Sequence, residues 1–109
     1  MLRIQIRESS AVIIFRLEGR FARERAEHVR SLVIKSNNDG IKLVFDLTEL
    51  LFVDNVGEEV LLFLRRLGGK FIAETSYALD VCERLDLPLA HNAVTHPPNP
   101  DGSNGQGPI

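Results

Sequence analysis

Carboxylates are the side chains of this sequence that could most readily do chemistry, and four of them lie close together: Asp46, Asp54, Glu58 and Glu59. Paired carboxylates can serve as general acid and base, provided that a nucleophile or a further base is positioned beside them. No histidine, lysine or nucleophile is recognisably arranged with these carboxylates in the sequence. The spacing therefore predicts a protein that is not an enzyme.

The remaining reactive side chains predict neither a metal site nor a cofactor. His28, His91 and His96 do not share a metal-binding spacing, and carboxylates and cysteines are not clustered near them. Cys82 is the only cysteine, which excludes an internal disulfide and a cysteine-based zinc site. It falls on the inward face of a predicted helix, so we expect a buried structural thiol. The glycine pairs fit neither a P-loop nor a dinucleotide-binding fingerprint.

Length and composition indicate one small globular domain. The chain has 109 residues, of which 44% are hydrophobic and 26% charged, enough for a modest core. Its formal net charge of -2 argues against general binding of nucleic acids, which needs a basic surface. The N-terminus lacks the unbroken apolar core of a signal peptide, and no apolar run approaches the roughly 20 residues of a membrane span. We therefore expect a cytoplasmic protein without membrane insertion.

The spacing of apolar residues predicts the elements that position these side chains. Alternation with period two indicates strands, and apolar residues three or four apart indicate helices that face a core. Gly, Asn and Pro mark where these elements end. The expected elements are strands at 2–7, 11–17, 42–47 and 70–74, helices from Phe21, Asn55 and Ser76, and an edge strand at 89–94. In the third helix, Leu79, Cys82 and Leu85 are expected to face inward.

The order of these elements is β-β-α-β-α-β-α with an optional last strand, which predicts an α/β fold. We expect a single domain with a mixed sheet of four to five strands and three helices. The first two strands are expected to form a hairpin, and the later strands to pair in parallel. The domain is assigned to residues 1–94. Residues 95–109 contain four prolines and three glycines and are predicted to be a flexible tail outside the core.

The segment Asp54–Glu59 is a polar corner between two apolar segments. Asn55 is placed to cap the following helix, and Glu58 can complete a capping box. Glu58 and Glu59 complement the positive end of the helix, and Gly57 permits the close approach of another backbone. Spacing alone therefore predicts a well-capped helix start, at the edge where α/β folds expose their working loops.

The segment 42–64, KLVFDLTELLFVDNVGEEVLLFL, resembles the signature of STAS domains, the sulfate-transporter and anti-sigma-antagonist family. In that signature an apolar strand ends in Asp-Leu-Ser/Thr, a short apolar link follows, and Asp-Ser/Thr-Ser/Thr-Gly opens a helix. Asp46-Leu47-Thr48 matches the first part, Glu49 to Val53 the link, and Asp54 and Gly57 the ends of the last part. Supporting matches are Leu17 to Phe21, Gly68-Gly69 and Thr75-Ser76, so that the resemblance covers about residues 2 to 90.

The resemblance implies a non-catalytic protein–protein interaction module in bacterial signalling and transcription regulation. In anti-sigma-factor antagonists, a serine or threonine just after the Asp is phosphorylated by a partner kinase that is also the anti-sigma factor, and the added charge breaks the complex. The corresponding positions here are Asn55 and Val56, which have no hydroxyl. We therefore expect no phosphorylation in this loop, and a corner that permanently resembles the unmodified, partner-binding form.

The resemblance also implies the partners: an anti-sigma factor or serine kinase, another STAS chain, or a cytoplasmic transporter component. A homodimer is a further expected assembly. The predicted partner-binding surface is the corner with the outward side of its helix, namely Asp54, Asn55, Val56, Gly57, Glu58, Glu59, Leu62, Arg65 and Arg66. Leu62 can equally be a scattered surface leucine. Two alternatives stay open: a module that senses a small ligand or nucleotide at the strand ends, and an enzyme of unknown type.

Overall fold

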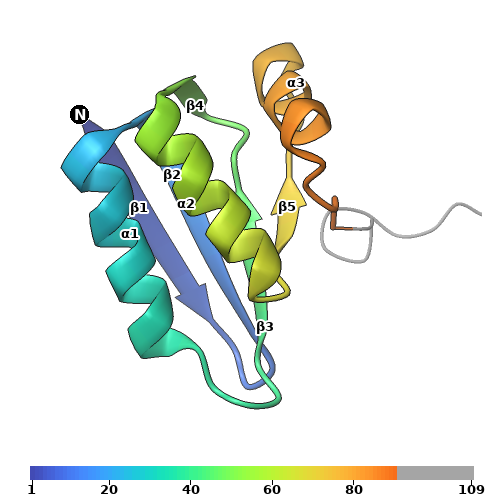
Figure 1. The fold of residues 1–109 in the computed structure, drawn as a ribbon. Coiled ribbons are helices and arrows are strands. Elements are labelled where there is room, and N and C mark those ends of the chain that lie inside the picture. The colour runs from blue at the N-terminus through green and yellow to red at the C-terminus, as the bar shows by residue number, and fades with distance from the viewer. Residues whose placement is uncertain (91–109) are drawn as a thin grey trace, which may run out of the picture.

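The computed structural model describes residues 1–90 as an α/β domain of five strands and three helices (Figure 1). The chain order and the mixed sheet confirm the predicted fold class. The elements are β1 (Leu2–Glu8), β2 (Val12–Phe21), α1 (Arg23–Ser36), β3 (Lys42–Asp46), β4 (Leu50–Val53), α2 (Asn55–Arg66), β5 (Lys70–Ile72) and α3 (Ser76–Leu85).

The sheet has the order β1-β2-β3-β5, and β4 pairs with the second half of β2. β1 and β2 form the expected antiparallel hairpin, in which Leu2 lies opposite Gly19. β3 pairs in parallel with the first half of β2 and with β5. Because α1 and α2 follow strands that run the same way, both helices begin at the same end of the sheet.

The segment predicted to be an apolar link, Glu49 to Val53, contains the strand β4. The prediction also ended β2 too early, because β2 continues through Gly19 to Phe21. The ladder shifts register between Gly19 and Arg20 and then pairs Phe21 with Val53 of β4. Gly19 has a φ of 106° and no room for a Cβ against the backbone oxygen of Met1, so only glycine fits this position. β4 therefore depends on a distant partner strand, not on a local pattern.

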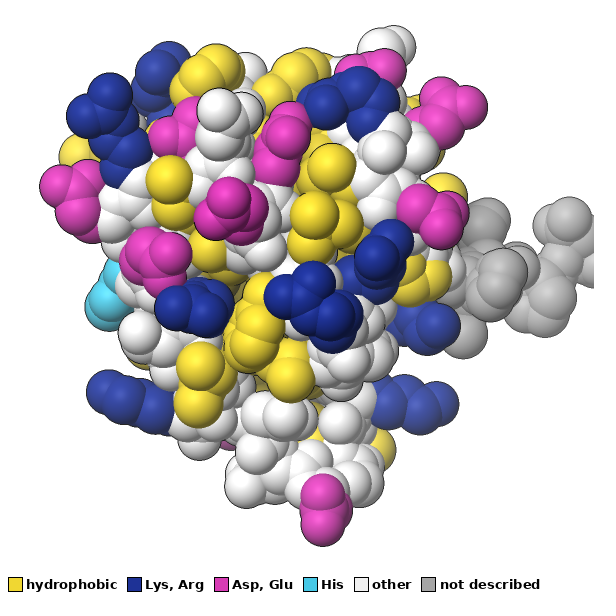
Figure 2. Space-filling view, in the orientation of Figure 1, with side chains coloured by type: hydrophobic (Ala, Val, Ile, Leu, Met, Phe, Trp, Pro, Cys, Tyr) yellow, Lys and Arg dark blue, Asp and Glu magenta, His cyan; other side chains and the backbone are white. Residues whose placement is uncertain are grey.

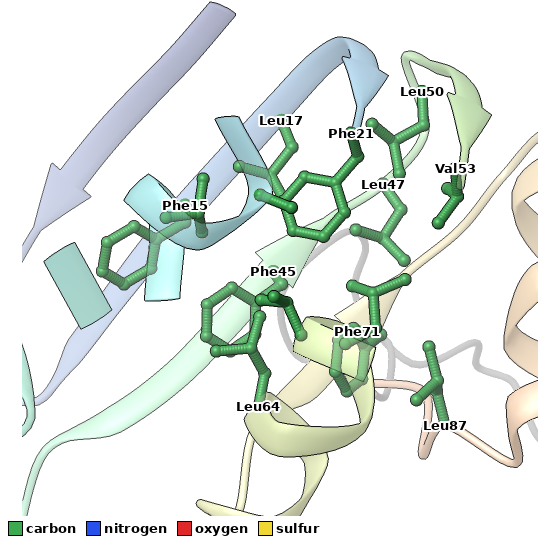
Figure 3. Packing of buried hydrophobic residues seen from close by; sticks show 14 of the residues in the cluster. Phe15, Leu17, Phe21, Phe45, Leu47, Leu50, Val53, Leu64, Phe71 and Leu87 are labelled. Carbon is green, nitrogen blue, oxygen red and sulfur yellow. The ribbon is translucent and has the colours of Figure 1, made fainter. Parts of the chain in front are cut away.

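The core lies between the sheet and the helices, which pack on the same side of it (Figures 1 and 3). Phe15, Phe45 and Phe71 come from three neighbouring strands and are fully buried. Their ring centroids lie 5.3 Å apart for Phe15 and Phe45 and 5.5 Å apart for Phe45 and Phe71. Each such side chain stabilises the fold by roughly 2–3 kcal/mol through burial. The neighbouring rings pack β2, β3 and β5 together on the face of the sheet that the helices cover.

The inward face of α3 differs from the prediction. Its buried residues are Ala78, Val81 and Cys82, and Leu79 is 43% exposed. Cys82 is buried, as expected. The helix is capped by Thr75, whose hydroxyl accepts from the Ala78 amide at 3.1 Å, and not by Ser76. Because both residues can cap a helix, local sequence does not decide between them.

The predicted edge strand at 89–94 lies mostly outside the described residues, as do the predicted tail and two of the histidines. Within residues 1–90, Leu89 forms a parallel bridge with Phe71 of β5. None of the described helices is long and apolar enough to cross a membrane.

Candidate partner-binding site

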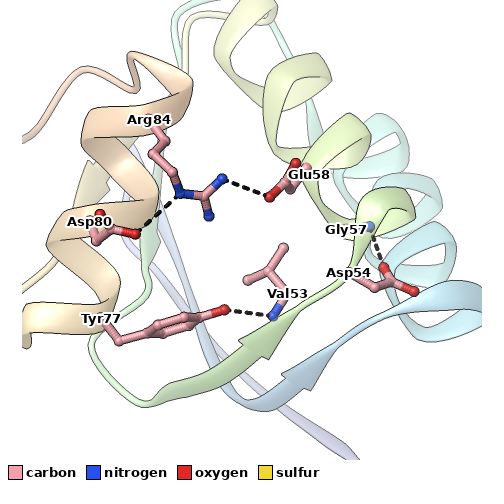
Figure 4. Close-up of polar contacts among 7 residues, drawn as sticks. All are labelled: Val53, Asp54, Gly57, Glu58, Tyr77, Asp80 and Arg84. Atoms are coloured by element: carbon pink, nitrogen blue, oxygen red, sulfur yellow. Dashed lines mark hydrogen bonds and ion pairs between the residues drawn. The ribbon is translucent and has the colours of Figure 1, made fainter.

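The corner is built around the carboxylate of Asp54, which follows β4 and caps α2 (Figure 4). Its Oδ1 accepts from the Gly57 amide at 2.8 Å. Its Oδ2 accepts from the Arg23 amide, at the start of α1, at 3.2 Å. One carboxylate thus satisfies free N–H groups in the first turns of two helices, where both helix dipoles favour negative charge.

Two details of the predicted cap are wrong. Asn55 is the first residue of α2 and not its N-cap, because Asp54 is the last residue with an extended backbone (φ -93°, ψ -173°). Glu58 does not form a capping box. Its carboxylate instead accepts from the Arg84 guanidinium of α3 at 3.0 Å. The distant bond to Arg23 holds Asp54 in the cap position, and sequence spacing does not show that bond.

Gly57 packs against the end of β2, which confirms the predicted close approach of a backbone. A Cβ at this position would overlap the carbonyl oxygen of Phe21 and lie 2.9 Å from Cγ1 of Val53. The Phe21 carbonyl oxygen also accepts a hydrogen bond from the Asp54 amide at 3.4 Å. The glycine therefore sets how closely the start of α2 sits on the sheet.

Polar contacts from α3 hold the other side of the corner. The Tyr77 hydroxyl accepts from the Val53 amide at 2.9 Å, at the outer edge of β4. Arg84 donates to Glu58 and, at 3.1 Å, to Asp80, and the hydrogen bond to Glu58 raises the pKa of the Arg84 guanidinium. These contacts, drawn in Figure 4, join α2, α3 and β4 around the corner.

Arg65 also points towards α3. Its guanidinium donates to the carbonyl oxygens of Leu85 at 3.0 Å and Asp86 at 3.3 Å. These oxygens lie at the C-terminal end of α3, where the last carbonyls lack helical partners and favour a cation. The contact gives Arg65 a structural role between helices.

The predicted surface thus separates into three parts. The corner itself presents Asn55, which is exposed, and Val56, which is half-buried. Glu58 and Arg65 face α3. The third part faces the groove between α1 and α2 and consists of Glu59, Leu62 and Arg66. Asn55, Val56 and Glu58 lie together at the start of α2, whereas Arg65 lies in its last turn and the third part lies along its length.

Two exposed hydrophobic residues lie beside the corner and are not among the predicted site residues. Leu51 and Phe52 of β4 are 76% and 38% exposed, just before Asp54. The Arg20 guanidinium lies 4.5 Å from the centre of the Phe52 ring, on which it stacks. In β4 the two middle residues, Leu51 and Phe52, are both exposed, whereas Leu50 and Val53 at its ends are buried.

The structure does not assemble the four carboxylates into one site. Asp46 accepts from the Thr48 amide at 3.0 Å in a local turn, and Asp54 and Glu58 are engaged as described above. Among residues 1–90, no group of three His, Cys, Asp or Glu side chains is placed to hold a metal ion.

The sheet face away from the helices contains a shallow hollow of about 430 Å³. Arg7 and Arg16 line one side of it, and Asp46 and Glu74 line the other. The hollow also includes Ile72 at the end of β5, and the residues of the corner do not line it.

Burial makes Cys82 an unreactive thiol. Desolvation raises its pKa from 9.0 to about 11. At pH 8 we expect Cys82 in the folded chain to react with Ellman's reagent at least about a hundredfold more slowly than in the chain unfolded by guanidinium, because the thiolate is the nucleophile. Equal rates in the two states would contradict this result.

The same shift predicts a loss of stability in alkali. Above pH 9.0 the unfolded chain releases the thiol proton, while the folded chain keeps it until about pH 11. The folded state then binds more protons, so this group lowers the free energy of unfolding as the pH rises through that interval.

Comparisons with known proteins agree with this fold. A family model for the STAS domain matches residues 3–70. Comparison with curated protein sequences gives no significant match.

The solved structures that share the fold include two anti-sigma-factor antagonists and a protein with a SpoIIAA-like fold. The unphosphorylated anti-sigma factor antagonist SpoIIAA has a TM-score of 0.63 and 16% identity, over 78% of this chain and 82% of its own. A STAS-domain antisigma-factor antagonist from Rhodobacter sphaeroides has a TM-score of 0.50 and 18% identity, over 71% and 90%. A DUF3478-family protein with a SpoIIAA-like fold from Shewanella loihica PV-4 has a TM-score of 0.54 and 19% identity, over 81% and 80%.

Proposed function

Because this chain belongs to the STAS domain family, we propose that it is a non-catalytic module that binds a protein partner through the corner at the start of α2. The observation that carries the proposal is the corner itself. Asp54 ties the starts of α1 and α2 together, and Leu51 and Phe52 are exposed beside it. A rigid polar turn flanked by exposed apolar side chains suits a protein interface better than a solvated loop.

The corner is proposed to bind its partner constitutively. Asn55 and Val56 cannot carry a phosphoryl group, and the two threonines of the family motif, Thr48 and Thr75, do not replace them. The hydroxyl of Thr48 is buried in the protein. The hydroxyl of Thr75 caps α3 by accepting a hydrogen bond from the Ala78 amide. The surface therefore lacks the site at which added negative charge would release a partner.

The partner class follows from the family and from the structural neighbours named as anti-sigma factor antagonists. We assign the corner to an anti-sigma factor or serine kinase in bacterial transcription regulation, in the cytoplasm. Another STAS chain or a transporter component would be recognised through the same kind of protein contact. A sensor of small ligands would instead show a ligand-dependent rise in melting temperature.

Affinity capture from the native lysate tests the proposal. The wild-type chain is compared with Val56→Glu, which places a carboxylate in the corner, and with Asn38→Glu, which adds the same charge to the exposed turn after α1. We expect the wild type and Asn38→Glu to retain the same kinase-like or STAS-containing protein, and Val56→Glu to lose it while remaining folded by circular dichroism. Identical capture by all three chains, or capture of nothing, would overturn the proposal.

A further inference from the structure

The groove between α1 and α2 presents a second surface, which runs along α2 and shares only Glu59 with the corner. It forms a shallow hollow of about 300 Å³, lined by Glu27 and Arg30 of α1 and, on α2, by Glu59, Val60, Leu62, Phe63 and Arg66. Figure 2 faces these helices and shows a hydrophobic strip between basic side chains, with acidic side chains above it. The described part of the chain places no other element over this strip.

Charge changes sign along the groove. On α2, Glu59 lies one turn from the helix start and Arg66 at its end, about 10 Å further along the axis. Leu62 and Phe63 lie between them and are partly buried. The exposed face of α2 is therefore acidic at one end, apolar in the middle and basic at the other end.

The adjoining face of α1 contributes to the same strip. Glu27, Arg30 and Ile34 are three and four residues apart, so that they lie in one row along the helix. Ile34 is 54% exposed. Arg30 is bound by Glu27 at 3.0 Å and stacks on Phe63 with 5.3 Å to the ring centre, so its charge is compensated within the chain.

We infer that a second copy of this chain docks on the α1–α2 face, with its α2 antiparallel to that of the first. An interface with two-fold symmetry requires a surface that is complementary to itself. Turning the face by half a turn about an axis through Leu62 and Phe63 brings Glu59 of each copy opposite Arg66 of the other. The same rotation places apolar side chains against apolar side chains, as in packed antiparallel helices.

Charge reversal and exchange test this arrangement. Sedimentation equilibrium of the full chain is expected to give twice the 12.2 kDa mass of one chain. Arg66→Glu and Glu59→Arg each place like charges together twice per dimer, so each single variant should weaken association at least about tenfold. The double variant restores opposite charges across the axis and keeps the net charge of the wild type, so it should regain the dimer.

Recovery of the dimer by the double variant would be specific to this antiparallel arrangement. Glu59 and Arg66 are both exposed and lie seven residues apart, too far to compensate for one another within one helix. A wild-type chain that stays a monomer up to about 1 mM would overturn the inference. So would single variants that still form dimers, or a double variant that does not. The inference is independent of partner binding at the corner, because Val56→Glu is expected to remain a dimer whether or not it loses a partner.

Discussion

We expect Gly57→Ala to lower the free energy of unfolding by about 3 kcal/mol, at the upper end of what overpacking usually costs. The added methyl would overlap the carbonyl oxygen of Phe21 and crowd the side chains of Val53 and Phe21. Backbone cannot move aside as a flexible side chain can, so the first turn of α2 must lift away from the sheet. The gain in helix propensity from alanine, about 1 kcal/mol, offsets only part of this cost. Urea unfolding followed by circular dichroism measures the difference.

Gly40→Ala is the matched control for this substitution. Gly40 has no atoms within contact distance of an added Cβ, but its φ is 84°. The same chemical change should therefore cost only about 1–2 kcal/mol, from backbone strain alone. If Gly57→Ala proved no less stable than Gly40→Ala, the close packing of α2 on β2 would not be a determinant of the corner.

Asp54→Ala is expected to cost about 2 kcal/mol, near the upper range for the loss of a helix cap. The carboxylate accepts from the Gly57 amide in α2 and the Arg23 amide in α1. Alanine leaves both donors without their partner, and Arg23 is also held at a φ of 51°, which is uncommon for a residue with a side chain. Thermal unfolding should show a midpoint lowered by roughly 8–16 °C.

Asp54→Ser separates the hydrogen bond to the Gly57 amide from the one to the Arg23 amide, and Asn55→Ala is the control for the cap assignment. Asn55 is exposed and provides no cap, so its replacement should change stability by less than about 0.5 kcal/mol. Serine at position 54 can still cap α2 but is too short to bridge both helices, so it should retain about half of the lost stability. Equal losses for Asp54→Ala and Asn55→Ala would contradict the assignment of the cap to Asp54.

Much of the fold could be predicted because it is encoded locally. The hairpin of β1 and β2, the strands β3 and β5 and the three helices lie close to where the spacing of apolar residues predicts them. These patterns depend on the period of each element and on one shared core face. The family signature was also readable, since its Asp and Gly positions lie at fixed spacing in one segment.

The details that could not be predicted are set by contacts between distant segments. The N-cap of α2 is Asp54 and not Asn55, and the carboxylate of Asp54 also accepts from the Arg23 amide, 31 residues away in the chain. β4 exists because a register shift in β2 offers it a partner. The direction of Arg65 towards α3 depends on the docking of that helix. Local sequence patterns do not show which distant residues will be in contact, so these details could not be predicted.

The most direct test of the central claim is the affinity of the captured partner for the wild-type chain and for Val56→Glu, measured by titration calorimetry with Asn38→Glu as the charge control. Burying an unpaired carboxylate in an interface costs free energy of desolvation. Val56→Glu should therefore bind the partner at least about a hundredfold more weakly. Asn38→Glu should bind like the wild type. If Val56→Glu, folded and as stable as the control, bound with unchanged affinity, the corner would be only the start of a helix and the partner would bind elsewhere.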